Sequence, residues 1–260
     1  MTAREDLPPI AAELLITCEH GGNKVPAAYR PLFNHCRSLL SSHRGFDPGA
    51  LVMACALAMH FNAPLVASMV SRLVVDLNRS IGHKHLHADF VRTLPAATRQ
   101  EIIERYYLPY RQETEQRVVE GIARRGMVIH ISCHSFTNNF NGVVRDTDIG
   151  LLYDPARRGE RALCAHWKDI LNTTAPGLEV RRNYPYEGRN DGLTSALRKK
   201  FPPDAYLGIE LELNQKELLR PTRQWKALRE SVIASLSTLL RDHDLTTQLQ
   251  YHHYREGMPQ

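Results

Sequence analysis

The stretch from Arg99 to Cys133, RQEIIERYYLPYRQETEQRVVEGIARRGMVIHISC, decides the fold class of this 260-residue chain. Apolar residues recur near helical spacing from about Arg99 to Arg125, which predicts a long amphipathic helix. Gly126 ends that helix, and the apolar run Met127–Cys133 then predicts a buried strand. A long helix that leads directly into a buried strand is typical of α/β proteins.

The same alternation continues in both directions along the chain. Apolar, β-rich runs predict further strands at Glu13–Cys18, Pro64–Val70, Arg72–Leu77, Asp148–Tyr153, Leu178–Asn183 and Tyr206–Leu213. Helical patterns cover Asp47–Asn62, Gly159–Leu171, Asp191–Lys200 and Pro221–Arg241. We therefore expect one α/β domain over residues 1–260, with a mostly parallel or mixed sheet and helices on both faces. The tail from about residue 246 lacks periodicity and is expected to be loosely ordered.

The composition excludes several classes of protein. With 43% hydrophobic and 23% charged residues, the chain has the balance of a globular protein that buries a core. Its longest apolar run, Ala50–Met59, is too short to span a bilayer, and its N-terminus lacks the apolar segment of a secretory signal. Five cysteines without a CxxC pair suit reduced thiols. We therefore expect a cytoplasmic protein with no membrane partner.

The chain is basic, with 33 Lys and Arg against 28 Asp and Glu. Its basic residues form short clusters, such as Arg124–Arg125 and Arg198–Lys200, and not a stripe interleaved with aromatic residues. The charge therefore favours a small anionic substrate over nucleic acid.

Three predicted strands end in polar residues, and in such sheets ligands gather beyond the carboxyl ends of strands. His20 lies in EHGGN, residues 19–23, directly after the first strand, and His134 directly follows another. Glu210 and Glu212 share one face of their strand because side chains alternate along it. Two histidines and a carboxylate suit an open zinc site, although a single histidine at a strand end is more often structural.

Other polar positions have two interpretations each. Asp47 reads as the N-cap of a helix or as a metal ligand. Arg79 could clamp a substrate carboxylate, or it could form an internal salt bridge with Asp76 or a glutamate. Asn183 lies in a turn-like segment and could bond a ligand. The histidines of HKHLH, residues 83–87, could bind a metal, but they suit a polar surface loop better. The familiar serine-hydrolase, phosphate-loop and HExxH zinc motifs are absent from the sequence.

Seven motifs, in order along the chain, resemble the N-formylglutamate amidohydrolase family. They are CEHGGNKVP (18–26), FDPGA (46–50), SRLVVDLNR (71–79), HSFTN (134–138), RDTDIGLLYD (145–154), NYPYEG (183–188) and GIELELNQ (208–215). The resemblance covers roughly residues 14–218. It implies a zinc-dependent amidohydrolase whose fold is akin to that of the zinc carboxypeptidases and aspartoacylases.

The resemblance also implies a set of metal ligands. His20 and His134 become zinc ligands. The carboxypeptidase pattern has a glutamate three residues after the first histidine, where this chain has Asn23, a poorer ligand. Asp47 therefore becomes the leading third ligand, with Asn23 as the alternative.

The expected activity is hydrolysis of the amide bond of an N-acyl amino acid, N-formyl-L-glutamate or a relative. In the resemblance, the base is a glutamate at the end of a late strand, and the register of Glu-Leu-Asn-Gln favours Glu212 over Glu210. The residues expected to hold the substrate carboxylates are Arg79 and Asn78, together with Arg145 or Asn183. The alternative is a non-catalytic module that binds a metal or an amino-acid derivative, and the Asn23 departure motivates it.

Overall fold

A six-stranded sheet forms the centre of the computed structural model, which describes residues 12–219 and 222–242. The strand order is β2-β1-β3-β8-β6-β7, and all neighbours are parallel except β8 and β6. The strands are β1 (Glu13–Cys18), β2 (Leu65–Ala67), β3 (Val128–Phe136), β6 (Ile149–Leu152), β7 (Val180–Arg182) and β8 (Tyr206–Asn214). The expected α/β fold with a mostly parallel, mixed sheet is confirmed.

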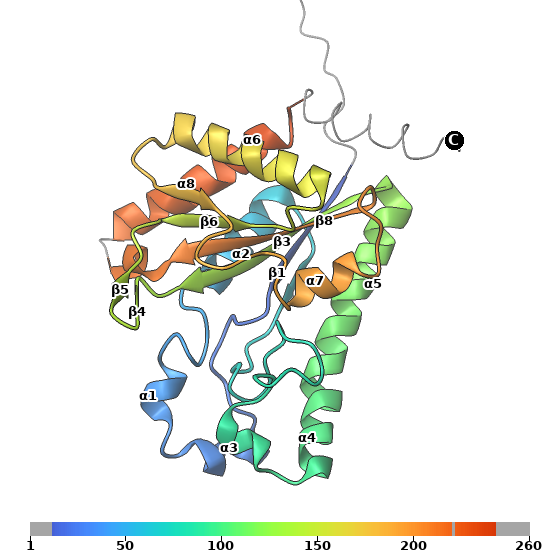
Figure 1. Ribbon diagram of the computed structural model, residues 1–260, viewed down its shortest axis with the longest axis vertical. Coiled ribbons are helices and arrows are strands. Elements are labelled where there is room, and N and C mark those ends of the chain that lie inside the picture. Colours follow the sequence, from blue (N-terminus) through green and yellow to red (C-terminus); the bar gives the residue numbers. More distant parts are fainter. Residues whose placement is uncertain (1–11, 220–221, 243–260) are drawn as a thin grey trace, which may run out of the picture.

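Helices cover both faces of this sheet (Figure 1). On one face, α2 (Ala50–Phe61), α6 (Arg158–Thr174) and α8 (Thr222–Leu239) pack around the buried Trp167. On the other face lie α5 (Leu108–Arg125) and α7 (Leu193–Arg198). Within the described residues, none of the helices is both long and apolar enough to cross a bilayer.

The alternation of side chains along β3 decides which residues reach the site. Ile131 and Cys133 point into the core under α2, α6 and α8. Ser132 and His134 therefore point to the opposite face. There β8 lies directly beside β3, with Glu212 paired in register with His134.

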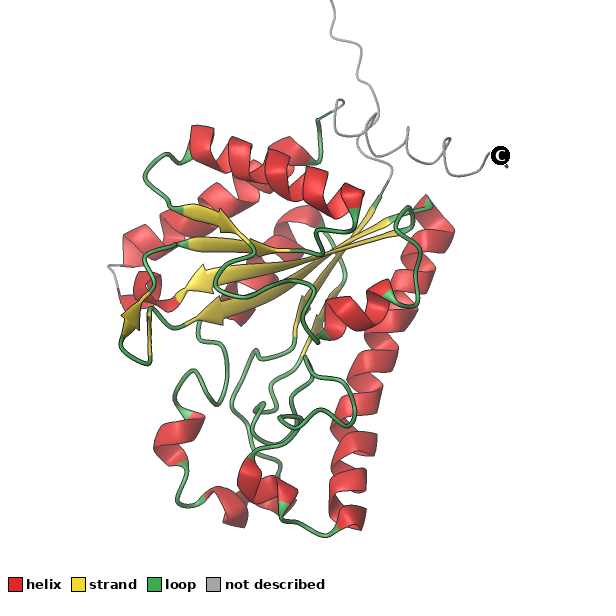
Figure 2. Cartoon of the chain, in the orientation of Figure 1, coloured by secondary structure: helices red, strands yellow, loops and turns green. Residues whose placement is uncertain are grey.

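A smaller lobe extends beyond the carboxyl ends of these strands (Figure 1), and Figure 2 shows that much of it is loop. Its short helical segments are η1 (Ala27–Phe33), α1 (Arg37–Leu40), α3 (Asp89–Arg92) and α4 (Ala96–Ile102). A small hairpin of β4 (Asn139–Phe140) and β5 (Val143–Val144) follows β3, and the turn η3 (Gln215–Leu219) follows β8. The site lies between the sheet and this lobe.

The strand expected at Arg72–Leu77 is wrong, because these residues form turns. The segment is buried and joins the core cluster under α5, but it pairs with no strand of the sheet. Its backbone groups bond to a loop instead: Asp76 N–H donates to Leu86 O, and Ala88 N–H donates to Leu73 O. Burial, not strand pairing, explains its apolar composition.

Two helix boundaries also differ from expectation. The helix expected from Asp47 begins at Ala50, with Gly49 as its N-cap in a left-handed conformation, so Asp47 is not the cap. The long helix expected over Arg99–Arg125 contains a π-helical turn between α4 and α5. That turn lies next to Pro109, which has no N–H to donate along the helix. The tail expected from residue 246 lies outside the described residues.

Candidate active site

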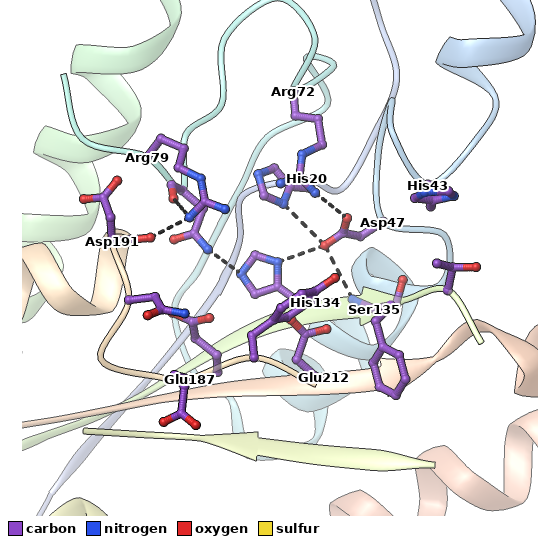
Figure 3. Close-up of a pocket in the computed structure, with 16 residues that line it drawn as sticks. His20, His43, Asp47, Arg72, Arg79, His134, Ser135, Glu187, Asp191 and Glu212 are labelled. Atoms are coloured by element: carbon purple, nitrogen blue, oxygen red, sulfur yellow. Dashed lines mark hydrogen bonds and ion pairs between the residues drawn. The ribbon is translucent and has the colours of Figure 1, made fainter. Parts of the chain in front are cut away.

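The buried side chains of His20, Asp47 and His134 meet at one oxygen of the Asp47 carboxylate (Figure 3). His20 follows β1, Asp47 precedes α2, and His134 lies on β3. Asp47 Oδ2 lies 3.3 Å from His20 Nδ1 and 2.9 Å from His134 Nδ1. The three side chains offer ligand atoms within 4.8 Å of one another, and all are buried. Two imidazole nitrogens and one carboxylate oxygen are a ligand set that zinc accepts.

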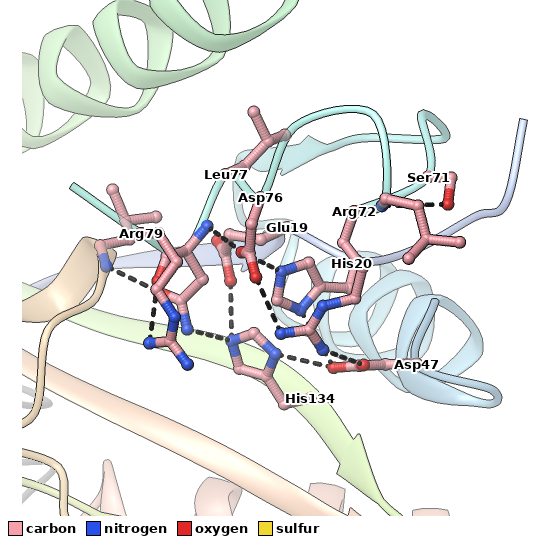
Figure 4. Close-up of polar contacts among 12 residues, drawn as sticks. Glu19, His20, Asp47, Ser71, Arg72, Asp76, Leu77, Arg79 and His134 are labelled. Carbon is pink, nitrogen blue, oxygen red and sulfur yellow. Dashed lines mark hydrogen bonds and ion pairs between the residues drawn. The ribbon is translucent and has the colours of Figure 1, made fainter. Parts of the chain in front are cut away.

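The second nitrogen of each ring faces another buried carboxylate (Figure 4). His20 Nε2 lies 2.7 Å from Asp76 Oδ1, and His134 Nε2 lies 2.9 Å from Glu19 Oε2. This is how metal-ligating histidines are held in proteins, because the outer carboxylate fixes the tautomer and leaves the inner nitrogen free to bind. The arrangement therefore fits a metal ion at His20, Asp47 and His134.

The carboxylates around the rings strongly favour positive charge at this point. Burial opposes protonation of His134, but its contacts with Asp47 and Glu19 outweigh burial and raise its pKa well above the usual value. Burial likewise opposes ionisation of Glu19, and yet the contact with His134 holds its pKa below the ordinary range. The carboxylates around these two rings would favour a bound metal cation for the same reason.

Arg72 holds two of these carboxylates in place. Its Nη1 donates to Asp47 Oδ1 at 3.2 Å, and its Nη2 donates to Asp76 Oδ2 at 3.0 Å. A planar guanidinium that bridges two carboxylates fixes the orientation of both. Arg72 binds one oxygen of each carboxylate, so the other oxygen of Asp47 and the other oxygen of Asp76 face His20.

The two glutamates of β8 line the same pocket but have different surroundings. Glu212 Oε2 is buried and has no hydrogen-bond partner among the described residues. Burial raises the pKa of Glu212 to about 8, and the nearby Asp47 and Glu210 carboxylates act in the same direction. Glu210 instead accepts a hydrogen bond of 2.7 Å from Thr194 Oγ1. Glu212 is thus the carboxyl group with an oxygen left for a ligand.

Arg79 stands at another side of this pocket, whose volume is about 200 Å³. Its Nη1 donates to the backbone oxygens of Asp191 and Asn78, at 2.6 and 3.3 Å. Its Nε is buried and has no partner among the described residues. The Asp191 carboxylate is held by Ser80, which donates both its N–H and its hydroxyl. Asp76 pairs with Arg72, so it is not the salt-bridge partner of Arg79.

Asn78 is brought to the centre, whereas Asn23 is not. Asn78 Nδ2 lies 3.4 Å from His134 Nε2, and Asn78 Oδ1 accepts a bond from Leu193 N–H. Asn23 is exposed, and its amide donates to Leu40 O, away from the two rings. The alternative of Asn23 as a metal ligand is therefore not supported by its position.

Arg145 and Asn183 also lie outside the pocket lining. Asn183 Oδ1 accepts hydrogen bonds from Tyr153 N–H and Gly188 N–H, so its amide shapes a loop. Arg145 donates to the hydroxyl of Tyr186, which does line the pocket. Both residues contact residues around the site, and their expected role in substrate binding stays a prediction.

Several residues of the site were not singled out by the sequence. Glu19 and Arg72 lie inside quoted motifs, and Arg72 falls in the strand expected at Arg72–Leu77. Tyr110 of α5 donates to Glu19 Oε1 at 2.8 Å and ties that helix to the centre. A charged residue inside a short apolar run, as at Arg72, was the signal that could have revealed a buried ion pair.

Comparisons with known proteins show the family and the fold of the chain. The model of the N-formylglutamate amidohydrolase family matches residues 12–219. The solved structure of gene product Atu2144 from Agrobacterium tumefaciens is 30% identical, with a TM-score of 0.72 over 88% of this chain and 92% of that chain. The N-formylglutamate amidohydrolase from Ralstonia eutropha JMP134 is 20% identical, with a TM-score of 0.66 over 95% of both chains, and has the same fold. A comparison with curated proteins finds no significant match.

Proposed function

This chain belongs to the N-formylglutamate amidohydrolase family, and from that premise we propose a zinc-dependent hydrolysis of N-acyl amino acids. The acyl group is formyl, and N-formyl-L-glutamate is the first substrate to test. One observation carries the proposal: two histidines and an aspartate offer ligand atoms within 4.8 Å of one another, beside a buried glutamate with an unpaired oxygen. A metal centre with an adjacent carboxylate base is what hydrolysis of an unactivated amide requires.

His20, Asp47 and His134 would hold the zinc ion, with Asp76 and Glu19 orienting the two rings. Such a site normally has three protein ligands and one open position. Zinc there supplies a Lewis acid that polarises the amide carbonyl and lowers the pKa of water. Asp47 and Arg72 remain paired throughout, which keeps the ligand oxygen directed at both rings.

Glu212 serves as the base. It takes a proton from the water whose oxygen attacks the formyl carbon, and it returns that proton to the amide nitrogen as the C–N bond breaks. Formate and the free amino acid leave. The unpaired Oε2 in the pocket supports this assignment over Glu210, whose carboxylate already accepts a bond from Thr194.

Arg79 would bind the substrate carboxylate next to the amide. Its unpaired, buried Nε is a charged donor that lacks a partner, and burying such a group is costly unless a ligand satisfies it. Asn78, which contacts His134 and borders the same pocket, is placed to assist.

Hydrolysis of a panel of N-formyl and N-acetyl amino acids by zinc-loaded protein tests the proposal. We expect stoichiometric formate release from N-formyl substrates, and no release by the zinc-treated His134→Ala variant. Stoichiometric zinc binding without turnover of any member would favour the non-catalytic binding module. The motivation for that alternative is the departure at Asn23, which lies away from both rings.

A further inference from the structure

The pocket lining includes two side chains that the proposed reaction does not use, His43 and Tyr186. Figure 3 shows His43 across the candidate metal centre from Arg79. Arg72 and Arg145 interact with both His43 and Tyr186, so both belong to one side of the pocket. A substrate with its first carboxylate at Arg79 would extend across the centre toward this side.

The hydroxyl of Tyr186 has a proton to donate. A tyrosine hydroxyl can both donate and accept hydrogen bonds. Arg145 Nη1 donates to this hydroxyl oxygen at 3.3 Å, so the contact uses an acceptor position and leaves the proton. None of the described residues accepts that proton. A bond received from a charged donor polarises the O–H group, which makes it a stronger donor to an anion.

Aromatic rings, and not a carboxylate, hold Arg145 in place. Three ring centroids surround its guanidinium carbon, at 4.6 Å for Phe140, 5.3 Å for Tyr186 and 6.0 Å for Phe136. Cation–π contacts stabilise a positive charge without neutralising it. Arg145 is buried and does not line the pocket, whereas Tyr186 does. Arg145 therefore acts on the pocket through the Tyr186 hydroxyl.

The loop that carries Tyr186 is fixed on both sides of it. Asn183 Oδ1 accepts hydrogen bonds from Tyr153 N–H and Gly188 N–H, at 3.0 and 3.2 Å. Arg198 Nη1 donates to Gly188 O at 2.6 Å. A hydroxyl on a fixed loop is held at one position in the pocket, which is what discrimination between similar ligands requires.

Positive charge extends to His43 on the same side. Burial lowers the pKa of His43, and neighbouring guanidinium groups lower it further, namely those of Arg44, Arg72 and Arg145. Asp47 opposes this shift without reversing it. Arg72 pairs with Asp47, whereas Arg145 has no carboxylate partner in the described chain. The charge of Arg145 is therefore left to attract an anion.

Glu187 does not cancel this charge, although it follows Tyr186 and lines the pocket. It is exposed, so water screens its carboxylate. Figure 3 shows that carboxylate directed away from His43 and from the candidate metal centre. The side of the pocket with His43 and Tyr186 therefore suits an anion.

We propose that Tyr186 is the specificity-determining residue for a second carboxylate on the substrate, which its hydroxyl receives, and that Arg145 is the positioning residue behind that hydroxyl. This inference rests on the proposed function and names the receptor for the side chain of N-formyl-L-glutamate. Loss of the hydroxyl should therefore weaken the distinction between a carboxylate and an amide at the end of that side chain.

N-formyl-L-glutamate and N-formyl-L-glutamine are the test pair, because they have almost the same shape and differ by one negative charge. We expect kcat/KM of the zinc-loaded wild type to be at least about tenfold higher for N-formyl-L-glutamate. Tyr186→Phe removes only the hydroxyl and should reduce this preference about tenfold or more, through a higher KM for N-formyl-L-glutamate. A wild type without the preference, or a variant that keeps it, overturns the inference.

Tyr184→Phe is the matched control, because Tyr184 lies in the same loop but outside the pocket lining. We expect Tyr184→Phe to keep the preference of the wild type. An equal loss of preference in Tyr184→Phe and Tyr186→Phe would identify the loop as the cause, and would overturn the assignment of the hydroxyl.

Arg145→Gln tests the positioning role. It should raise KM for N-formyl-L-glutamate with little change in kcat, and it should change the preference little further when combined with Tyr186→Phe. Equal losses for both substrates would indicate a structural role and overturn the assignment of Arg145. A loss of preference that adds fully to that of Tyr186→Phe would do the same, because Arg145 would then act independently of the hydroxyl.

If no N-formyl amino acid is hydrolysed, the proposed function fails, and binding decides the inference. Calorimetry then compares N-formyl-L-glutamate binding to the zinc-loaded wild type and to Tyr186→Phe. Binding at least about tenfold weaker in the variant supports the role of the hydroxyl. Equal binding, or no binding to either protein, overturns it.

Discussion

At the scale of single residues, Asp47 Oδ2 faces both imidazoles and would share a metal with them. Because three ligands hold a catalytic zinc, loss of one ring should abolish stable binding. We expect His20→Ala and His134→Ala to retain almost no zinc after gel filtration, measured as metal per chain. His85→Ala is the control, since His85 is exposed on a loop away from the centre. Full zinc occupancy in His134→Ala would contradict the ligand assignment.

The two glutamates of β8 allow catalysis to be separated from binding. Glu212→Gln keeps the size of the side chain but removes its ability to accept a proton. We expect kcat to fall by roughly 10²- to 10⁴-fold while zinc content stays near that of the wild type. Glu210→Gln should alter folding or KM more than kcat, because Glu210 is bonded to Thr194. A collapse of kcat in Glu210→Gln with near-normal Glu212→Gln would move the base by two residues.

His130 makes the stability of the protein depend on pH. Its ring is fully buried between the hydroxyls of Thr17 and Tyr206, and burial lowers its pKa to about 4. The folded protein therefore keeps the ring neutral, while the unfolded chain takes up a proton below about pH 6.5. The free energy of unfolding contributed by His130 is level above pH 6.5 and falls by about 3 kcal/mol between pH 6.5 and pH 4.

Urea unfolding of the wild type and of His130→Gln at several pH values measures this effect. The variant should lose less stability on acidification, by about 3 kcal/mol over that interval, because other titrating groups are common to both proteins. Parallel curves for the two proteins would show that His130 is not the titrating group.

At the scale of elements, β6 touches the loop that carries Tyr186. A Cβ on Gly150 would lie 2.1 Å from Tyr184 O, a backbone atom that cannot move alone. We expect Gly150→Ala to reduce the free energy of unfolding by about 1–3 kcal/mol and to raise KM, since the loop must shift away from β6. Gly177→Ala is the control, because nothing lies within 4 Å of a Cβ at Gly177. Urea unfolding and steady-state kinetics measure both quantities, and equal behaviour of the two variants would contradict the close approach.

The pattern of apolar residues predicts those strands that are buried because they pair with neighbouring strands of the sheet. β3 and β8 are long apolar strands in the middle of the sheet, and their positions agree with the sequence to within a few residues. The segment from Arg72 to Leu77 has the same apolar composition but is buried by a loop packing under α5. Hydrogen bonds to residues 86–88 replace strand pairing there, and no local pattern identifies these partners in the sequence.

At the scale of the whole molecule, the site is only partly predictable, because contacts between distant segments of the chain leave no local pattern in the sequence. His20 and His134 follow apolar strands, so their meeting at one edge of the sheet could be expected. Arg72 reaches Asp47 across 25 positions, and Glu19 meets Ser132 across 113. Such contacts are set by how the lobe folds over the sheet. The family resemblance indicates which residues belong to the candidate site, but only the structure gives the distances between them.

The hairpin of β4 and β5 stands apart from the central sheet. It hangs between β3 and β6, with Val143 64% exposed and Val144 62% exposed. The ring centroid of its Phe140 lies 4.6 Å from the guanidinium carbon of Arg145, and the hairpin forms no part of the central sheet. A change in the length of the hairpin leaves the pairing of β1, β3 and β8 untouched, because the hairpin pairs with none of these strands. We therefore expect the hairpin to tolerate insertions that the buried central strands would not.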